Sequence, residues 1–88
     1  MNDKTDAQWA ERNDKLEKQF VFANFPQAMS FMLRVSYECE KMDHHPEWKN
    51  VYNKVWVALS THDAGNKVTD KDRKLAKKMD EIGKLFAT

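Results

Sequence analysis

The residues of this chain best suited to chemistry near neutral pH are its three histidines. His44 and His45 are adjacent, and His62 follows His44 by 18 residues. Histidine titrates close to neutral pH, so one imidazole can donate a proton while another accepts one. The three side chains therefore form a candidate site, provided that the fold brings them together.

Three interpretations of these histidines are open at this point. A histidine at the end of a helix can simply be a solvated turn residue. Three imidazoles can also bind zinc, although adjacent histidines normally point in different directions, and the sequence has no pair of histidines four residues apart. In the third interpretation, which we favour, the histidines act as acid and base, while Glu40, Asp43 and Asp63 hold the tautomers and orient the rings.

A helix over about residues 25–42 is expected to position the histidine pair. Apolar residues recur there at three- and four-residue steps, which predicts one buried stripe. They are Ala28, Phe31, Met32, Val35, Cys39 and Met42. Asn24 offers an N-cap and Pro26 fits the first turn. Because Pro46 cannot continue a helix, the pair should lie where this helix stops.

A strand is expected to carry His62. Residues 48–52 resemble one strand, and a second follows a turn or continuation at 53–54. In the second strand Val55, Val57 and Leu59 form an apolar face, which predicts a half-buried antiparallel strand. The same alternation places His62 on the less apolar face. His62 can reach the pair only if a turn or a sheet neighbour folds this strand back.

The remaining elements complete one domain over residues 1–88. Residues 1–8 are expected to be disordered, and short strands over 9–12 and 16–23 are joined by a turn at 13–14. Thr69 and Asp72 resemble the capping box of a last helix, over about 70–86. We interpret Lys71 and its charged neighbours as the solvated face of that helix. Interspersed strands and helices predict an α+β two-layer sandwich, with an antiparallel sheet covered on one side by helices.

Composition excludes several classes of function. The chain has 15 Lys and Arg against 14 Asp and Glu, so no general charge excess draws it to nucleic acid or to an anionic membrane. Cys39 is the only cysteine, on the apolar stripe of the first helix, so we expect it to be buried and the protein to work in a reducing, intracellular setting. We also expect no signal peptide and no membrane span, because no apolar run approaches the ~20 residues that a span needs.

Several segments together resemble the pterin-4a-carbinolamine dehydratase family. They are Glu40-Lys41-Met42-Asp43-His44-His45-Pro46-Glu47-Trp48, Val51-Tyr52-Asn53-Lys54-Val55, Leu59-Ser60-Thr61-His62-Asp63, the upstream segments Phe20-x-Phe22-x-x-Phe25 and Ala28-x-x-Phe31-Met32-x-Arg34-Val35, and Thr69-x-x-Asp72. The resemblance runs from about residue 9 to residue 82. The His-His-Pro-x-Trp and Thr-His-Asp pair at this separation is its most specific part.

The resemblance implies a hydro-lyase that removes water from 4a-hydroxytetrahydrobiopterin, giving quinonoid dihydrobiopterin in tetrahydrobiopterin recycling. It implies neither a metal nor another cofactor. His44, His45 and His62 would be the catalytic residues: His44 and His62 would share the acid and base roles, and His45 would bind and orient the pterin. The substrate would be bound by these histidines together with Glu40, Asp43, Ser60, Thr61 and Asp63.

The resemblance also implies the assembly and the partners. The family fold has a four-stranded antiparallel sheet with helices on one face. A homodimer or homotetramer is expected, in the cytoplasm and also in the nucleus, with no direct contact to nucleic acid or membrane. The alternative function is that of a non-catalytic dimerisation cofactor, which binds the dimerisation segment of a transcription factor through a helical surface.

Overall fold

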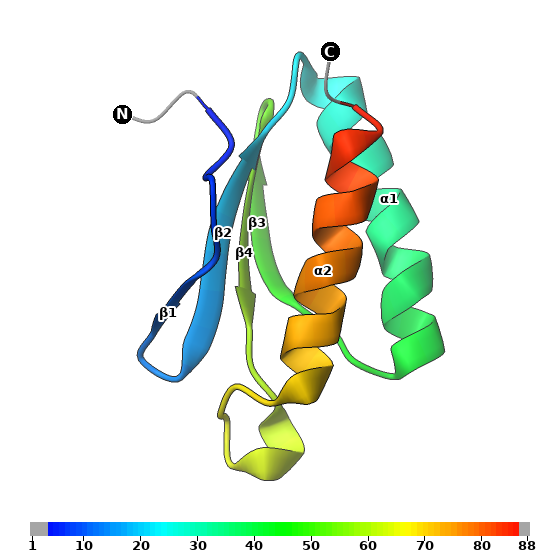
Figure 1. Ribbon diagram of the computed structural model, residues 1–88. Helices are drawn as coiled ribbons and strands as arrows, with labels where there is room; N and C mark the ends of the chain where they lie inside the picture. The colour runs from blue at the N-terminus through cyan, green and yellow to red at the C-terminus, as the bar shows by residue number, and fades with distance from the viewer. Residues whose placement is uncertain (1–3, 87–88) are drawn as a thin grey trace.

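The computed structural model describes residues 4–86. In chain order the elements are β1 (Ala10–Arg12), β2 (Lys15–Val21), α1 (Phe25–Met42), β3 (Glu47–Val51), β4 (Lys54–Leu59), the short 3-10 helix η1 (His62–Ala64) and α2 (Asp70–Lys84). The sheet has the order β1-β2-β4-β3, and each neighbouring pair is antiparallel. Both helices lie side by side on one face of this sheet (Figure 1). The predicted α+β two-layer sandwich with a four-stranded antiparallel sheet is confirmed.

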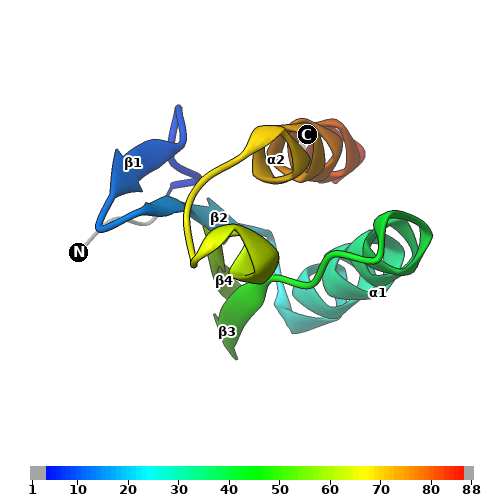
Figure 2. The same ribbon diagram turned by 90° about the horizontal axis from the view of Figure 1, so that it is seen from below.

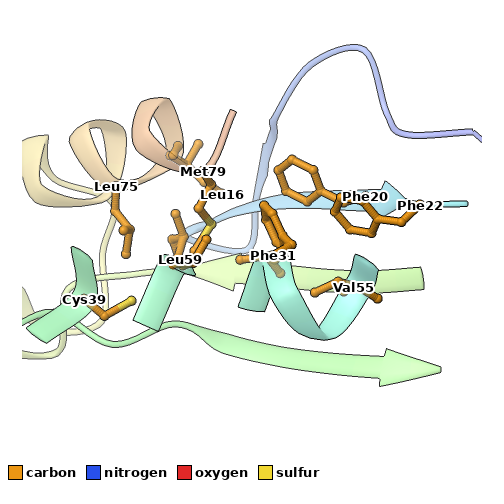
Figure 3. Close-up of a cluster of buried hydrophobic side chains, with 13 residues drawn as sticks. Leu16, Phe20, Phe22, Phe31, Cys39, Val55, Leu59, Leu75 and Met79 are labelled. Carbon is orange, nitrogen blue, oxygen red and sulfur yellow. The ribbon is translucent and has the colours of Figure 1, made fainter. Parts of the chain in front are cut away.

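The core lies between the sheet and the two helices. Phe20 of β2 and Phe22, the first residue after this strand, project towards Phe31 of α1, with ring centroids 4.7 and 4.9 Å from that ring (Figure 3). Leu75 and Met79 contribute the inward face of α2 and are fully buried. The predicted stripe of α1 is confirmed at its buried positions, which are Ala28, Phe31, Val35 and Cys39. Burial of these side chains fixes the rotation of both helices about their axes. It therefore also fixes the directions of the side chains at the ends of the helices.

The hairpin of β3 and β4 brings His62 back towards the histidine pair. The two strands pair from Val51↔Lys54 at the turn to Glu47↔Ala58 at the open end. Residues that follow β4 must therefore lie beside the residues that precede β3, because antiparallel partners stay in register. The register places the segments 43–46 and 60–63 at the same end of the sheet.

The end of β4 differs from the expectation. We predicted that the strand runs on to His62, but it stops at Leu59, and His62 lies in η1 instead. The cause is a local backbone pairing, in which the Thr61 N–H donates to the Lys67 carbonyl at 2.8 Å and closes residues 61–67 into a tight loop. Gly65, with a φ of 80°, ends η1 inside this loop.

Two residues of the stretch 1–8, for which we expected disorder, form hydrogen bonds to β2. Thr5 Oγ1 accepts from the Val21 N–H at 2.8 Å, and Asp6 Oδ2 accepts from the Gln19 N–H at 2.8 Å. These bonds hold the two residues against β2. Residues 1–3 lie outside the described part of the chain. Neither helix within residues 4–86 has the length and apolar character that crossing a membrane requires.

Candidate active site

The expected site residues gather in a pocket of about 240 Å³ at one end of the molecule. Three connections meet there: the segment between α1 and β3, the segment from β4 through η1, and the first turn of α2. They lie at the lower end of Figure 1, which Figure 2 shows from below. The lining residues are Asp43, His44, His45, Ser60, Thr61, His62, Asp63 and Lys71.

The end of α1 fixes the backbone of the histidine pair. Asp43 adopts a left-handed conformation with a φ of 50°, and the His44 N–H donates to the Cys39 carbonyl at 3.0 Å. This is the six-to-one bond of a Schellman motif, which satisfies a terminal carbonyl and turns the chain out of the helix. The predicted stop is confirmed, but Asp43 ends the helix three residues before Pro46. His44 is thus the first residue beyond a rigid end.

His44 is held from the inside of the protein by Asp72. The ring Nε2 lies 2.5 Å from Asp72 Oδ1, and Asp72 is 0% exposed while His44 is 6% exposed. Three groups donate to the other carboxylate oxygen: the Thr61 hydroxyl at 2.7 Å, the Thr69 N–H at 2.8 Å and, at a longer 3.5 Å, the Thr69 hydroxyl. With these donors on Oδ2, the bond to His44 is best satisfied when Nε2–H donates to Oδ1. The buried carboxylate then fixes both the tautomer and the plane of the imidazole.

The second nitrogen of His44 faces the pocket. Within residues 4–86, Nδ1 of His44 has no hydrogen-bond partner in the protein. Every buried side-chain nitrogen or oxygen in this part of the chain does have such a partner, so Nδ1 is not one of the buried atoms. Nδ1 is therefore reached by solvent, through the pocket that the residue lines. With the hydrogen on Nε2, Nδ1 carries the lone pair. This arrangement can accept a proton from a ligand in the pocket.

His62 reaches the pocket from η1 and is exposed. Its Nδ1 lies 3.2 Å from the Asn66 side-chain oxygen, so a Nδ1–H can donate there. Asn66 has a φ of 60° within the tight loop. The loop therefore supplies both the position of the ring and a partner for one of its nitrogens, which leaves Nε2 for a ligand.

His45 lies at the rim. Its Nε2 is 3.1 Å from Glu40 Oε1, and the two side chains are 62% and 79% exposed. An exposed pair of this kind contributes little to stability, but it orients the ring. Glu40 is the one expected site residue that does not line the pocket. It borders a neighbouring hollow of about 290 Å³, to which His45 also belongs.

The zinc interpretation finds no ligand set among the described residues. Nowhere in residues 4–86 do three or more His, Cys, Asp or Glu side chains lie close enough together to share a metal ion. Cys39 is buried as expected, and burial raises the pKa of its thiol to about 11. The site therefore offers imidazoles, carboxylates, hydroxyls and one ammonium group to a ligand.

Two contributors to the site were missed by sequence reasoning. Asp72 was identified as half of a capping box, and its bond to the Thr69 N–H confirms that role. Asp72 was also counted among the charges of the solvated face of this helix, which is wrong because the residue is 0% exposed. Its contact with His44 is a second role. Lys71 was assigned to the solvated face of the last helix, yet it lines the pocket. The capping box could have pointed to Asp72, since it predicts a carboxylate turned inward at the start of a helix.

The chain matches known proteins along most of its length. A family model described as Pterin 4 alpha carbinolamine dehydratase matches residues 1–82. A protein of Opitutus terrae is 54% identical over 74 residues, which are 84% of this chain and 76% of the relative. A protein of Bradyrhizobium diazoefficiens is 56% identical over 72 residues, or 82% of this chain and 71% of the relative. Both are named "Putative pterin-4-alpha-carbinolamine dehydratase".

Solved structures share the fold. A protein from Brucella melitensis described as transcriptional coactivator/pterin dehydratase has a TM-score of 0.83 and 40% identity, over 88% of this chain and 83% of its own. A pterin dehydratase-like protein described as a RuBisCO assembly factor in the alpha-carboxysome has a TM-score of 0.74, over 86% of this chain and 89% of its own. Its 20% identity shows a common fold alone.

Proposed function

The chain belongs to the pterin-4-alpha-carbinolamine dehydratase family, and we propose that it dehydrates 4a-hydroxytetrahydrobiopterin to quinonoid dihydrobiopterin by histidine acid–base catalysis. The observation that carries this proposal is the environment of the two ring nitrogens of His44. One ring nitrogen is held by a buried carboxylate, and the other faces a pocket that His62 also lines. A paired base and acid is what the removal of water from neighbouring atoms requires.

The reaction moves two protons and breaks one bond to oxygen. The proton on N5 of the pterin leaves to a base, and its bonding electrons form the N5=C4a double bond. The C4a–O bond breaks as this double bond forms, and an acid protonates the departing oxygen to give water. No electron is exchanged with another reactant, so the step balances with an acid and a base alone.

His44 is the base in this proposal. Its Nδ1 accepts the N5 proton, and the imidazolium that forms is stabilised by the Asp72 carboxylate 2.5 Å from Nε2. Asp72 acts through His44 and is a positioning residue. The geometry around this pair is fixed by the Schellman motif on one side and by the capping box on the other.

His62 is the acid, and its Nε2 delivers the proton to the 4a oxygen. Its contact with Asn66 supports this role, because a donor bond from Nδ1 leaves Nε2 facing a ligand. His45 binds and orients the pterin from the rim, assisted by Glu40. Ser60, Asp43 and Asp63 supply further hydrogen-bonding groups around the ring.

Stopped-flow absorbance with freshly generated 4a-hydroxytetrahydrobiopterin tests this function. Catalytic amounts of the protein should accelerate dehydration over the spontaneous reaction, before and after treatment with a chelator. Acceleration that disappears with the chelator would return the three histidines to the zinc interpretation. An unchanged rate in the presence of the protein would contradict the proposal.

We place the reaction in tetrahydrobiopterin recycling in the cytoplasm, carried out by a homodimer or homotetramer. The outer face of α1 supports association, because Leu33 and Tyr37 lie one turn apart and are 59% and 61% exposed. Light scattering of the purified protein tests the assembly. A monomer at micromolar concentration would contradict it.

A protein-binding role is the second candidate function. The relative from Brucella melitensis is described as transcriptional coactivator as well as pterin dehydratase, and Leu33 and Tyr37 present an apolar surface away from the pocket lining. A pull-down with the dimerisation segment of a homeodomain transcription factor tests this role. Retention by the wild type and by His44→Ala, but not by a Leu33→Ser and Tyr37→Ser double variant, is the expected pattern.

A further inference from the structure

We propose that Lys71 is a substrate-binding residue, whose ammonium group donates a hydrogen bond to the C4 carbonyl oxygen of the pterin ring. This inference rests on the proposed function and names a contact within the same pocket. Lys71 lies in the first turn of α2, immediately before the residue that holds His44. It lines the pocket that the three histidines line.

The position of Lys71 follows from the helix around it. Successive helical residues are rotated by about 100°, so an inward Asp72 places Lys71 at the side of α2. Helical side chains also lean towards the N-terminus, and the pocket lies at that end of α2, since its other lining residues come from the segments 43–45 and 60–63. The ammonium group is therefore carried towards the pocket, while the next side chain enters the core.

Lys71 has no competing protein partner. Among residues 4–86 it forms no hydrogen bond or ion pair, and its side chain is exposed. Other lysines of the chain are engaged: Lys18 pairs with Asp80 at 2.8 Å and Lys15 with Glu47 at 2.8 Å. A cation that borders a pocket without a partner is available to a ligand acceptor.

The donors of the pocket favour this assignment. The Thr61 hydroxyl donates to Asp72 at 2.7 Å, and the Asp43 and Asp63 carboxylates have only acceptor atoms when ionised. His44 and His62 are occupied with the two proton transfers, and His45 Nε2 at the rim is engaged with Glu40. Ser60 and Lys71 remain as side-chain donors, and charge-assisted hydrogen bonds are the stronger kind. The C4 carbonyl is bonded to C4a, the carbon that loses its hydroxyl, so a pterin placed for the reaction keeps this oxygen inside the pocket.

Calorimetric titration with 7,8-dihydrobiopterin tests the contact without turnover, because this molecule retains the C4 carbonyl and lacks the 4a hydroxyl. Lys71→Met should raise its Kd about tenfold, and Lys71→Arg should stay within about threefold of wild type because charge and donor are kept. Lys74→Met is the matched control. It removes the same charge from an exposed position one turn along α2, outside the pocket lining, and should leave Kd unchanged.

The outcomes separate this inference from the proposed function. Equal Kd values for wild type and Lys71→Met, or an equal loss in Lys74→Met, would overturn the role of Lys71 alone. Weaker binding by Lys71→Met in a protein that does not accelerate dehydration would support Lys71 as a pterin ligand while contradicting the dehydratase. Absence of binding by the wild type would overturn both. The melting temperatures of Lys71→Met and wild type should agree, because the described structure gives this side chain no contact to lose.

Discussion

Asp72 Oδ1 lies 2.5 Å from His44 Nε2, and the two side chains are buried together beneath the pocket. They come from positions 28 residues apart. The same carboxylate caps α2 through its other oxygen. One side chain thus starts a helix and holds the ring that we propose to be the base.

Asp72→Asn should lower kcat by about 10²-fold or more, because an amide can donate to Nε2 and reverse the tautomer of His44. Turnover kinetics with the carbinolamine substrate measure this, and circular dichroism checks that the variant is folded. Asn24→Ala serves as the control, since it removes the N-cap bond of α1 to Gln27 and should cost ~1 kcal/mol of stability without changing kcat. Unchanged turnover in a folded Asp72→Asn would remove Asp72 from the mechanism.

The two layers of this fold could be predicted from local patterns in the sequence, but the contacts between the side chains of the site could not. The alternation of Val55, Val57 and Leu59 and the apolar stripe around Phe31 each report a buried face, and one face per element is enough to place helices over a sheet. The contact between His44 and Asp72 depends on how α1 and α2 pack, which no local pattern contains. The end of β4 was predicted too late because the alternation continues through Ser60, whereas the pairing of Thr61 with Lys67 is a loop contact.

His45→Ala should affect binding more than chemistry. The ring is at the rim, its side chain is 62% exposed, and its contact is the exposed Glu40. We expect KM to rise while kcat falls by less than about tenfold, below the loss typical of a proton-transfer residue. Steady-state kinetics over a range of substrate concentrations separate the two effects. A fall in kcat equal to that of His44→Ala would make His45 a proton-transfer group instead.

Gly83→Ala should destabilise the protein although alanine favours helices. A Cβ at this position would lie 3.3 Å from Phe20 Cε2. Phe20 cannot move aside easily, because it packs between Phe31 and Trp9. Overpacking of this kind costs ~1–3 kcal/mol, against a gain in helix propensity of up to ~1 kcal/mol. Urea unfolding measures the difference, and a more stable variant would show that Phe20 relaxes freely.

Cys39 should make the free energy of unfolding depend on pH in the alkaline range. Burial raises the pKa of its thiol from 9.0 to about 11, so the folded state keeps the proton that the unfolded state releases. The contribution is complete below pH 9.0 and is lost as the pH rises towards about 11. Urea unfolding at pH 8, 9 and 10 should show wild type losing more stability than Cys39→Ala. Parallel losses in the two proteins would contradict the burial effect.

The most direct test of the mechanism compares wild type, His44→Ala and His62→Ala in the dehydration of 4a-hydroxytetrahydrobiopterin. If His44 and His62 are the proton-transfer pair, each single variant should lower kcat by ~10²–10⁴-fold. The double variant should lose little more than the worse single variant, because groups that act as a unit are not additive. Losses below tenfold in both single variants, from proteins that still fold, would contradict histidine acid–base catalysis in this pocket.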